Sequence, residues 1–225
     1  MNRKKIPLGL YGITAENFSN GKSNIDVVKE MINSGIKIIQ YREKYKSMKE
    51  KVIEAIEISK ICKENDVLFI VNDHVDIAII TNADGIHVGQ DDIPVSIIRK
   101  LIGNDKIIGL STHSPEEAKK ALGEDIDYIG VGPLFPTTTK DRKAVGLEYL
   151  EYVQNNINIP YVAIGGIKES NLSDIINLGA KRICLVSDIV GSNNIREKID
   201  KLNSIIEGGN KWIILLKWML PKKEY

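Results

Sequence analysis

The chain has 225 residues, of which 43% are hydrophobic and 27% charged, and this composition excludes collagen-like, disordered and disulfide-stapled proteins. Because 31 Lys and Arg residues nearly balance 30 Asp and Glu residues, the net charge of +1 offers no field that would gather nucleic acid or an anionic membrane. The two cysteines, Cys62 and Cys184, cannot form a disulfide framework, and no apolar signal region follows the basic N-terminus. The longest apolar stretch, at 212–220, is interrupted by Lys217 and is far shorter than the roughly 20 residues that span a bilayer. We therefore expect a cytoplasmic protein with no nucleic acid and no membrane among its partners.

Short apolar runs alternate along the chain with longer segments in which apolar residues recur at helical spacing. The predicted strands are Leu8–Ile13, Ile36–Gln40, Val67–Val71, Gly85–Val88, Ile107–Leu110, Tyr128–Val131, Tyr161–Ile164 and Ile183–Val186. The predicted helices lie near residues 23–34, 47–64, 74–81, 94–101, 115–122, 146–157, 169–178 and 193–207. One helix start is strongly marked, because Ser114 can cap the helix, Pro115 suits its first turn and Glu117 stands three residues after the serine.

The predicted strands are continuous Val, Ile and Leu runs, which are typical of strands buried on both faces of a parallel sheet covered by helices. Eight successive βα units predict an α/β fold of the (β/α)8 TIM-barrel type in a single domain, with residues 1–207 forming the barrel and residues 208–225 an apolar C-terminal extension. An open doubly wound sheet is the alternative. Its dinucleotide-binding version is disfavoured, because no Gly-x-Gly-x-x-Gly follows the first strand.

Basic and amide side chains follow the second predicted strand. In a TIM barrel the loops after the strands build the catalytic mouth, so residues at these positions are candidates for chemistry. Gln40, Arg42 and Lys44 stand two residues apart, and in an extended segment such residues share one face. Three donors on one face suit a diphosphate, whereas the structural alternative is a solvated basic loop.

Acidic residues follow the next two strands. Asn72 and Asp73 come after the third strand, and Asp91 and Asp92 after the fourth. Neighbouring parallel strands lie about 4.8 Å apart, so carboxylates at their ends can reach one cation. Magnesium is commonly held by one or two carboxylates together with substrate phosphate oxygens. We predict that carboxylates from this group bind Mg²⁺; the alternative is that Asp73 and Asp92 cap the helices that follow.

A serine and a hydroxyl-rich loop follow the fifth and sixth strands. Ser111 ends the fifth strand ahead of the Ser114 cap, which leaves its hydroxyl available to the mouth. The sixth strand runs into a long loop that carries Thr137, Thr139 and Lys140. Long loops in compact units are usually functional or disordered, and these hydroxyls and this ammonium can bind anions. A purely structural turn is the alternative.

The last two strands end in Gly165-Gly166 and in Leu185-Val186-Ser187. In this fold the loops after strands seven and eight commonly bind a phosphate, because glycine lets backbone N–H groups approach the anion. Glycine pairs also occur simply as turns. Taken together, the strand ends predict a metal-assisted diphosphate site over strands two to four and a monophosphate site over strands seven and eight.

The remaining conspicuous residues are interpreted as structural. His87 lies in an apolar strand and is expected to be a core residue rather than a catalytic one, since the three histidines lack zinc-binding spacing. Cys62 and Cys184 fall in apolar positions and are expected to be buried small hydrophobes.

The residues at the strand ends resemble those of the thiamine phosphate synthase family, also called thiamine phosphate pyrophosphorylase. The matching segments stand in the family's order over residues 8–205; they are Gln40-Tyr41-Arg42-Glu43-Lys44, Asn72-Asp73, His87-Val88-Gly89-Gln90-Asp91-Asp92, Gly109-Leu110-Ser111, Gly130-Val131-Gly132-Pro133 through Pro136-Thr137-Thr138-Thr139-Lys140, and Ala163-Ile164-Gly165-Gly166-Ile167. The resemblance implies a TIM-barrel transferase that joins 4-amino-2-methyl-5-hydroxymethylpyrimidine diphosphate to 4-methyl-5-(2-phosphoethyl)thiazole, or to its carboxylated form. The products would be thiamine phosphate and pyrophosphate.

The resemblance also implies a role for each matching residue. The pyrimidine diphosphate would be held by Gln40, Arg42, Lys44, Asn72 and Lys140, with Ser111 close to the pyrimidine. The thiazole phosphate would be received by Thr137, Thr139, Gly166, Val186 and Ser187, and Mg²⁺ by Asp73 and Asp92. We hypothesise a dissociative displacement in which Mg²⁺, Arg42, Lys44 and Lys140 neutralise the leaving diphosphate. Ser111, Lys140 and Arg42 are the predicted catalytic residues.

Three segments depart from the family's pattern. Tyr41 stands where an aliphatic residue is common, and the segment 141–144 lacks a proline often found before Gly146. The extension 208–225 carries Trp212 and Trp218 among aliphatic residues, which predicts either an extra helix on the outside of the barrel or a contact in a homo-oligomer. Three rival functions remain at this point: a thiazole tautomerase of the same fold, a non-catalytic protein that senses thiazole phosphate or thiamine phosphate, and a barrel enzyme of sugar-phosphate metabolism. The third would explain Gly165-Gly166 but not the pair of acids.

Overall fold

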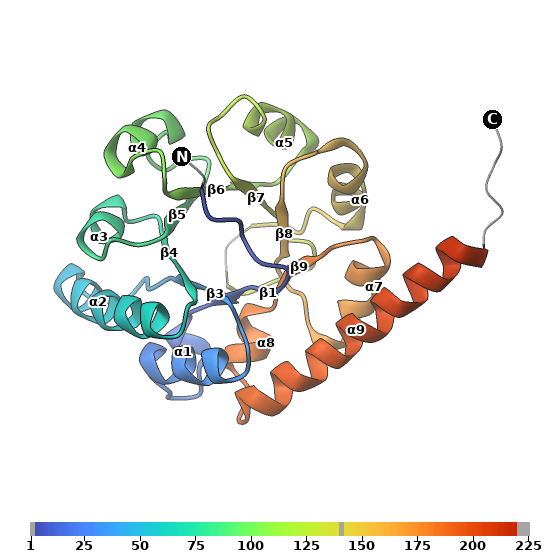
Figure 1. Cartoon of the computed structure of the whole chain (residues 1–225), viewed down its shortest axis with the longest axis horizontal. Coiled ribbons are helices and arrows are strands. Elements are labelled where there is room, and N and C mark those ends of the chain that lie inside the picture. The colour runs from blue at the N-terminus through green and yellow to red at the C-terminus, as the bar shows by residue number, and fades with distance from the viewer. Residues whose placement is uncertain (1–2, 140–141, 220–225) are drawn as a thin grey trace.

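The computed structural model describes residues 3–139 and 142–219, with only the backbone described for residues 210–219. Its strands form one parallel sheet surrounded by a ring of helices (Figure 1). The first predicted strand is interrupted at Tyr11 and becomes β1 (Gly9–Leu10) and β2 (Gly12–Ile13). Because β1 pairs with the last strand, β9 (Arg182–Cys184), and β2 pairs with β3 (Ile38–Tyr41), the sheet closes on itself. The TIM-barrel prediction is confirmed, and the open-sheet alternative is wrong.

The other elements alternate in the predicted order. The remaining strands are β4 (Leu68–Asn72), β5 (Gly85–Val88), β6 (Ile107–Thr112), β7 (Tyr128–Val131) and β8 (Tyr161–Ile164). The helices between and after the strands are η1 (Glu16–Phe18), α1 (Asn24–Asn33), α2 (Met48–Glu64), α3 (Val75–Ile80), α4 (Val95–Ile102), α5 (Pro115–Ala121), α6 (Leu147–Asn156), η2 (Glu169–Asn171), α7 (Leu172–Asn177), α8 (Val186–Val190) and α9 (Ile195–Met219). The short helix α8 was not predicted. The apolar run that was assigned to a strand through Val186 leaves the sheet after Cys184, and periodicity alone cannot separate strand from helix in so short a run.

Side-chain caps account for where several helices begin. The hydroxyl of Ser114 accepts a hydrogen bond from the backbone N–H of Glu117 and Pro115 occupies the first turn of α5, as the sequence predicted. Helix α2 begins with a capping box between Ser47 and Glu50. These local signals set the residues at which α2 and α5 begin.

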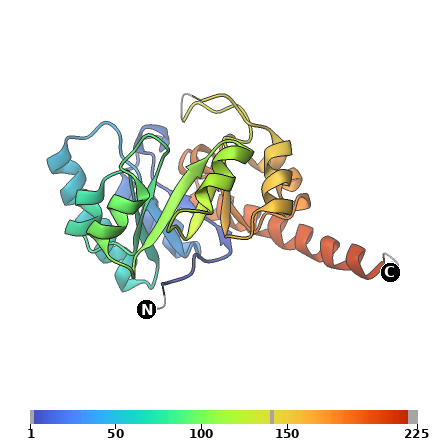
Figure 2. The same ribbon diagram turned by 90° about the horizontal axis from the view of Figure 1, so that it is seen from above.

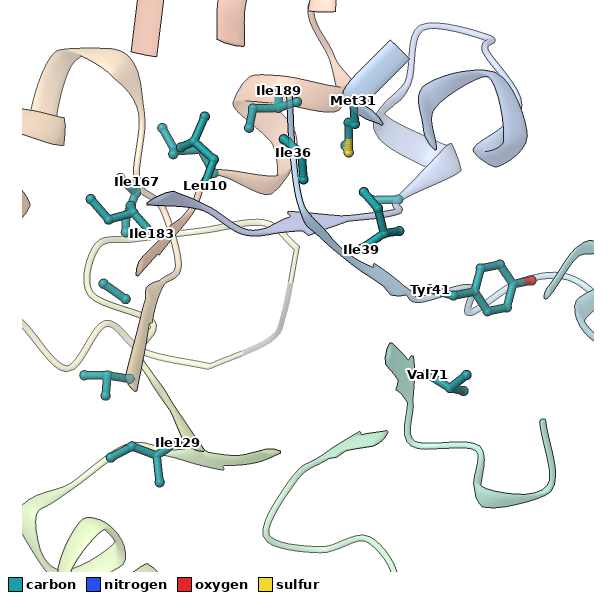
Figure 3. Close-up of a cluster of buried hydrophobic side chains, with 14 of the residues drawn as sticks. Leu10, Met31, Ile36, Ile39, Tyr41, Val71, Ile129, Ile167, Ile183 and Ile189 are labelled. Carbon is teal, nitrogen blue, oxygen red and sulfur yellow. The ribbon is translucent and has the colours of Figure 1, made fainter. Parts of the chain in front are cut away.

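The apolar core has two layers, one outside the barrel and one inside it. The outer layer packs the strands against the helices; Figure 3 shows part of it, including Leu10, Ile39, Val71 and Ile183. The inner layer fills the barrel lumen from alternate positions of the strands, as a period of two requires. Its members are Ile6, Tyr11, Ile13, Ile38, Ile70, Ile107, Tyr128, Val162 and Cys184. Cys184 and Cys62 are buried free thiols, which confirms their interpretation as small hydrophobes.

One strand glycine makes room for polar side chains in the lumen. A Cβ atom on Gly109 of β6 would lie 2.2 Å from Cζ of Tyr128 and 2.5 Å from Nδ1 of His87. Both neighbours are buried and cannot retreat into solvent. Gly109 therefore permits the tyrosine and histidine rings to meet inside the barrel.

We expect Gly109→Ala to lower the free energy of unfolding by about 1–3 kcal/mol, because a methyl group here overpacks the lumen. Urea denaturation followed by circular dichroism measures this loss. The matched control is Gly208→Ala in α9, where a Cβ atom meets nothing within 4 Å. That change should be neutral or stabilise by up to about 1 kcal/mol, since alanine favours helix over glycine. Equal stability of the two variants would contradict the packing argument.

The C-terminal helix α9 is continuous across the predicted domain boundary at residues 207 and 208. A Cβ atom on Gly209 would lie 2.6 Å from Ile176 of α7, so α9 packs against α7 up to that point. Beyond it the backbone of α9 extends past the ring of helices (Figures 1 and 2). A separate role for residues 208–225 stays a prediction. In the part of the chain that the structure describes, no helix is both long and apolar enough to cross a membrane.

Candidate active site

A pocket opens at the carboxyl ends of the strands, where the sequence predicted the chemistry to lie. Seven predicted site residues line it: Gln40, Arg42, Asn72, Ser111, Thr137, Thr139 and Val186. The predicted residues Lys44, Asp73, Asp92, Gly166 and Ser187 are not among its lining residues, although the chain positions next to several of them are. Lys140 lies outside the described residues. Residues at the ends of five strands, β3, β4, β6, β7 and β9, thus converge on one cavity.

Arg42 is held rigidly beside the pocket. Its backbone N–H donates to the hydroxyl of Thr14 at 2.8 Å, and that hydroxyl donates to the carbonyl of Arg42 at 3.0 Å. Its guanidinium donates to the carbonyl of Thr139 at 3.2 Å, which ties the end of β3 to the loop after β7. Burial lowers the pKa of Arg42, and its buried Nε has no hydrogen-bond partner among the described residues. A desolvated cation with an unused donor is suited to an anionic ligand.

Asp73 and Asp92 form a pair of neighbouring carboxylates. Lys44 places its ammonium 2.8 Å from Oδ2 of Asp73, and the carboxylate of Asp92 accepts a hydrogen bond from the backbone N–H of Gly89 at 2.7 Å. Partial burial raises the pKa of Asp92, and the adjacent charge of Asp73 raises it further. Like charges this close favour a shared cation.

The helix-cap alternative for these two acids is wrong. The residue at the N-cap of α3 is His74, and the residue at the N-cap of α4 is Pro94. Neither helix start has a side-chain cap hydrogen bond. Asp73 adopts a left-handed backbone with φ of 63°, and its N–H donates to the carbonyl of His87 at 2.9 Å. Its carboxylate is thus turned to Lys44 rather than to the helix.

The loop after β7 brings two threonine hydroxyls to the pocket. The Oγ1 atoms of Thr137 and Thr139 lie 2.9 Å apart, and the backbone N–H of Thr139 donates to Oγ1 of Thr137 at 3.2 Å. Both side chains line the pocket. The loop is thus internally bonded and presents hydroxyl donors at the mouth.

The strand ends opposite this loop have little room for side chains. Gly166 has φ of 64°, and a Cβ atom there would lie 2.5 Å from the carbonyl oxygen of Pro136. Gly166 therefore lets the loops after β7 and β8 approach each other closely. Val186, the first residue of α8, lines the pocket, and Ser187 follows it.

Three polar lumen residues were not predicted as site residues. Tyr11, His87 and Tyr128 all line the pocket and are bonded to one another. The two phenolic oxygens lie 2.8 Å apart, and Nδ1 of His87 lies 3.0 Å from the hydroxyl of Tyr128. Burial raises the pKa of both phenols, so they stay protonated. His87 is buried, as predicted, but its ring lies at the pocket end of the barrel lumen and lines the pocket. The available signal was its position two residues after Gly85, which places it on the inward face of β5.

A second polar cluster lies behind the loop that carries Arg42 and Lys44. The carboxylate of Glu43 accepts hydrogen bonds from the backbone N–H of Tyr45 at 2.7 Å and from Asn24 at 3.0 Å. Burial opposes ionisation of Glu43, but these hydrogen bonds outweigh it and lower the pKa of the carboxyl. Glu43 is thus not among the residues that line the pocket, and it fixes the backbone that follows it at Tyr45 and Lys46.

The same cluster gathers more negative than positive charge. The ammonium of Lys46 lies 2.6 Å from Glu54 and 2.5 Å from Glu16, and carboxylate oxygens of Glu16, Glu43 and Glu54 lie within 4.8 Å of one another. The hydroxyl of Tyr41 donates to Glu54 at 2.8 Å. The tyrosine that departs from the family's usual aliphatic residue therefore helps to satisfy this buried carboxylate.

We expect Glu43→Ala to lower the free energy of unfolding by about 1–3 kcal/mol, because backbone donors and Asn24 lose their acceptor. The same change should also raise the KM for any anionic substrate bound beside Arg42, because Glu43 holds the backbone next to it. Since the pKa of Glu43 is lowered by folding, the stability gap to wild type should be full above pH 4.5 and shrink as the pH falls below it. Urea denaturation at several pH values measures both effects. The exposed Glu57→Ala on α2 is the control, with an expected change within about 0.5 kcal/mol.

The chain is similar to a known family over most of its length. Residues 10–189 match the model of a family described as "Thiamine monophosphate synthase". A "Thiamine-phosphate synthase" of Caldicellulosiruptor saccharolyticus is 52% identical over 200 residues, covering 88% of this chain and 90% of the relative. Another of that description, from Pelotomaculum thermopropionicum, is 53% identical over 199 residues, covering 88% and 91%. The solved structure titled "Thiamine phosphate pyrophosphorylase from Pyrococcus furiosus" superposes with a TM-score of 0.82 at 34% identity, covering 90% of this chain and 96% of that one.

Proposed function

Because the chain belongs to the thiamine monophosphate synthase family, we propose that its barrel mouth joins a pyrimidine diphosphate to a thiazole phosphate. Its relatives are described as thiamine-phosphate synthases, and this chain makes thiamine phosphate as well. The observation that carries the assignment of sites is the desolvated guanidinium of Arg42, which stands beside the pocket with an unused donor. A thiazole tautomerase would have no diphosphate for that cation to bind.

The diphosphate lies over the ends of β3 and β4 in this proposal. Arg42 and Lys44 supply positive charge, and Asn72 supplies an amide group from the pocket wall, while the buried Gln40, bonded to Tyr11, faces the pyrimidine. Lys140 completes the cationic set. The hydrogen bond from Arg42 to the carbonyl of Thr139 supports this arrangement, because it brings the loop that precedes Lys140 next to the guanidinium.

Asp73 and Asp92 fit a divalent cation. They are neighbouring carboxylates, and Lys44 pairs with Asp73 at 2.8 Å. Partial burial, and after it the charge of Asp73, raises the pKa of Asp92, so a cation would stabilise its ionised form. Two carboxylates leave positions for water and phosphate oxygens, which is how Mg²⁺ is usually held. When bound, the ion would neutralise charge on the diphosphate oxygens.

The thiazole phosphate lies on the opposite side of the mouth. Thr137 and Thr139 offer hydroxyls, and Gly166, Val186 and Ser187 follow β8 and β9 at the same end of the barrel. The tight approach of the loops at Gly166 supports a site built from backbone groups. The two substrates would then meet over the lumen, with the pyrimidine nearest Ser111.

The reaction requires the protein to position the two substrates and to stabilise charge, and it requires no nucleophile from the protein. The bond between the pyrimidine methylene carbon and the diphosphate oxygen breaks, and its electron pair leaves with the diphosphate. The aminopyrimidine ring delocalises the positive charge that remains, and the lone pair of the thiazole nitrogen then forms the new carbon–nitrogen bond. Arg42, Lys44 and Lys140 hold the leaving group as its charge grows. The pocket walls keep the two rings facing each other.

The test is a reconstitution with purified protein, synthetic pyrimidine diphosphate and thiazole phosphate. Thiamine phosphate is read by mass spectrometry and pyrophosphate by a coupled assay, with Mg²⁺ and with EDTA. We expect equal amounts of both products, abolished by EDTA. Binding of thiazole phosphate without product would refute the synthase assignment and support a tautomerase or sensor. Parallel reactions with the carboxylated thiazole phosphate identify which form is used.

We further infer that the protein acts in the cytoplasm and that the apolar part of 208–225 contacts a second copy of the chain. Two buried free cysteines are compatible with a reducing compartment. Burial raises the pKa of Cys62 to about 12, so this thiol is unreactive. Light scattering of the full chain and of a chain ending at residue 207 tests the oligomer. The same number of copies per particle in both would refute it.

A further inference from the structure

A continuous row of hydrogen bonds crosses the floor of the pocket. It runs from Gln40 on β3 through Tyr11, Tyr128 and His87 to Ser111 on β6. The amide Nε2 of Gln40 donates to the hydroxyl of Tyr11 at 3.0 Å, and Nε2 of His87 lies 2.9 Å from Oγ of Ser111. The five side chains are between 1% and 8% exposed, so water has little access to the row.

The direction of the row follows from the proton count of its members. The amide nitrogen of Gln40 can only donate, so the oxygen of Tyr11 accepts and its single proton is free to donate to Tyr128. Tyr128 then donates to Nδ1 of His87, and the neutral imidazole carries its proton on Nε2 and donates it to Ser111. With the bonds in this direction, every hydroxyl or N–H proton within the row is donated to the next member. The hydroxyl proton of Ser111 remains available to a ligand in the pocket.

The opposite sense is less favourable. If Ser111 donated to His87 and the imidazole to Tyr128, the proton of Tyr128 would point to Tyr11. Tyr11 would accept two hydrogen bonds, and its own proton would find no acceptor among the residues that the structure describes. An unpaired buried donor is costly, whereas the hydroxyl of Ser111 lies at the pocket, where a ligand can satisfy it.

We propose that Tyr11, Tyr128 and His87 are positioning residues that fix Ser111 as a donor and Gln40 as an acceptor toward the amino edge of the pyrimidine. The inference rests on the proposed function, in which the pyrimidine lies over Ser111. A 4-aminopyrimidine presents a ring nitrogen that accepts beside an amino group that donates. The 4-oxo analogue presents a ring N–H beside a carbonyl, which reverses the pattern. The row therefore favours the amino form, because it keeps Ser111 a hydrogen-bond donor although Tyr11 and Tyr128 do not touch Ser111 themselves.

The test removes one phenolic oxygen and keeps its ring. Tyr128→Phe breaks the row between Tyr11 and His87, so the imidazole and Ser111 can reverse their sense. The matched control is Tyr149→Phe, which removes a buried hydroxyl bonded to Thr112 at 2.7 Å, outside the row. We expect Tyr128→Phe to lower kcat with the amino substrate about tenfold and to leave the KM for thiazole phosphate unchanged. Its preference for the amino over the 4-oxo diphosphate should also fall about tenfold, while the control keeps the wild-type preference.

A double-mutant cycle separates positioning from a general structural effect. If Tyr128 acts through Ser111, Tyr128→Phe should change kcat less than about twofold when Ser111 is already alanine. Full additivity of the two changes, or an unchanged amino preference in Tyr128→Phe, would overturn the proposal. Tyr11→Phe breaks the row at another link and should reproduce the result if Tyr128→Phe folds poorly. A wild-type protein that makes no thiamine phosphate would instead refute the proposed function, so the two failures are distinguishable.

Discussion

Replacing Asp92 with asparagine is expected to lower kcat/KM for thiamine phosphate formation at least about a hundredfold, the usual loss when one group that stabilises transition-state charge is removed. The carboxylate of Asp92 lies beside that of Asp73, and partial burial raises its pKa. An amide oxygen there binds Mg²⁺ more weakly, so the Mg²⁺ concentration for half-maximal activity should rise about tenfold or more. The backbone N–H of Gly89, which donates to Asp92 at 2.7 Å, can still donate to the amide oxygen. We therefore expect the fold to be retained.

The neighbouring residue supplies the control for this change. Asp91→Asn removes the same charge one position away, from a side chain that is exposed as that of Asp92 is. It should leave kcat/KM and the Mg²⁺ dependence within about twofold of wild type, as surface substitutions commonly do. Steady-state assays across a Mg²⁺ titration, with thermal unfolding in parallel, make the comparison. Equal losses in both variants would mean that net charge at the mouth, and not a ligand at Asp92, is responsible.

Replacing Arg42 with methionine is expected to lower kcat by about a hundredfold or more, again the scale of one lost charge-stabilising group. Its guanidinium is desolvated, with Nε buried and without a described partner, so it interacts strongly with a diphosphate whose charge grows as the bond breaks. Methionine also loses the hydrogen bond to Thr139, and the loop after β7 is then less well held. Arg42→Lys keeps the charge but loses the planar arrangement of the guanidinium donors. Its kcat should lie between those of Arg42→Met and wild type.

Arg182 offers a control at the opposite end of the barrel. It too is half-buried, its pKa is lowered by burial, and its guanidinium donates to the carbonyl of Ile6 at 3.1 and 3.2 Å. Arg182→Met should lower the free energy of unfolding as much as Arg42→Met does, or more, but leave kcat within about twofold. Single-turnover measurements of product formation and urea denaturation separate the two effects. A comparable loss of kcat in Arg182→Met would show that Arg42 acts through stability alone.

Much of the fold follows from local sequence. Continuous Val, Ile and Leu runs predict strands buried on both faces, and the Ser114-Pro115 start of α5 was predicted from capping chemistry alone. The predictions failed where a local pattern is ambiguous. The apolar run through Val186 fits both strand and helix, and contacts with the rest of the barrel decide that its end becomes α8.

Some residues of the candidate site could also be predicted from local sequence, and others could not. Gln40, Arg42, Asn72 and Ser111 were predicted because polar residues at strand ends are conspicuous after apolar runs. Tyr11, Tyr128 and His87 were missed, since aromatic and imidazole rings inside apolar strands look like core residues. The capping alternative for Asp73 and Asp92 could be rejected only from the geometry of the helix starts.

The order of the βα units, the charged strand ends and the family can be read from the sequence, because each depends on short segments of neighbouring residues. How the barrel closes through the split strand at Tyr11, and which side chains meet in its lumen, follows only from the packing of the whole barrel. The hydrogen-bonded partners there stand 29 residues apart for Gln40 and Tyr11, and 117 apart for Tyr11 and Tyr128. Side chains so distant in the chain become neighbours only when parallel strands bring their inward faces around one axis.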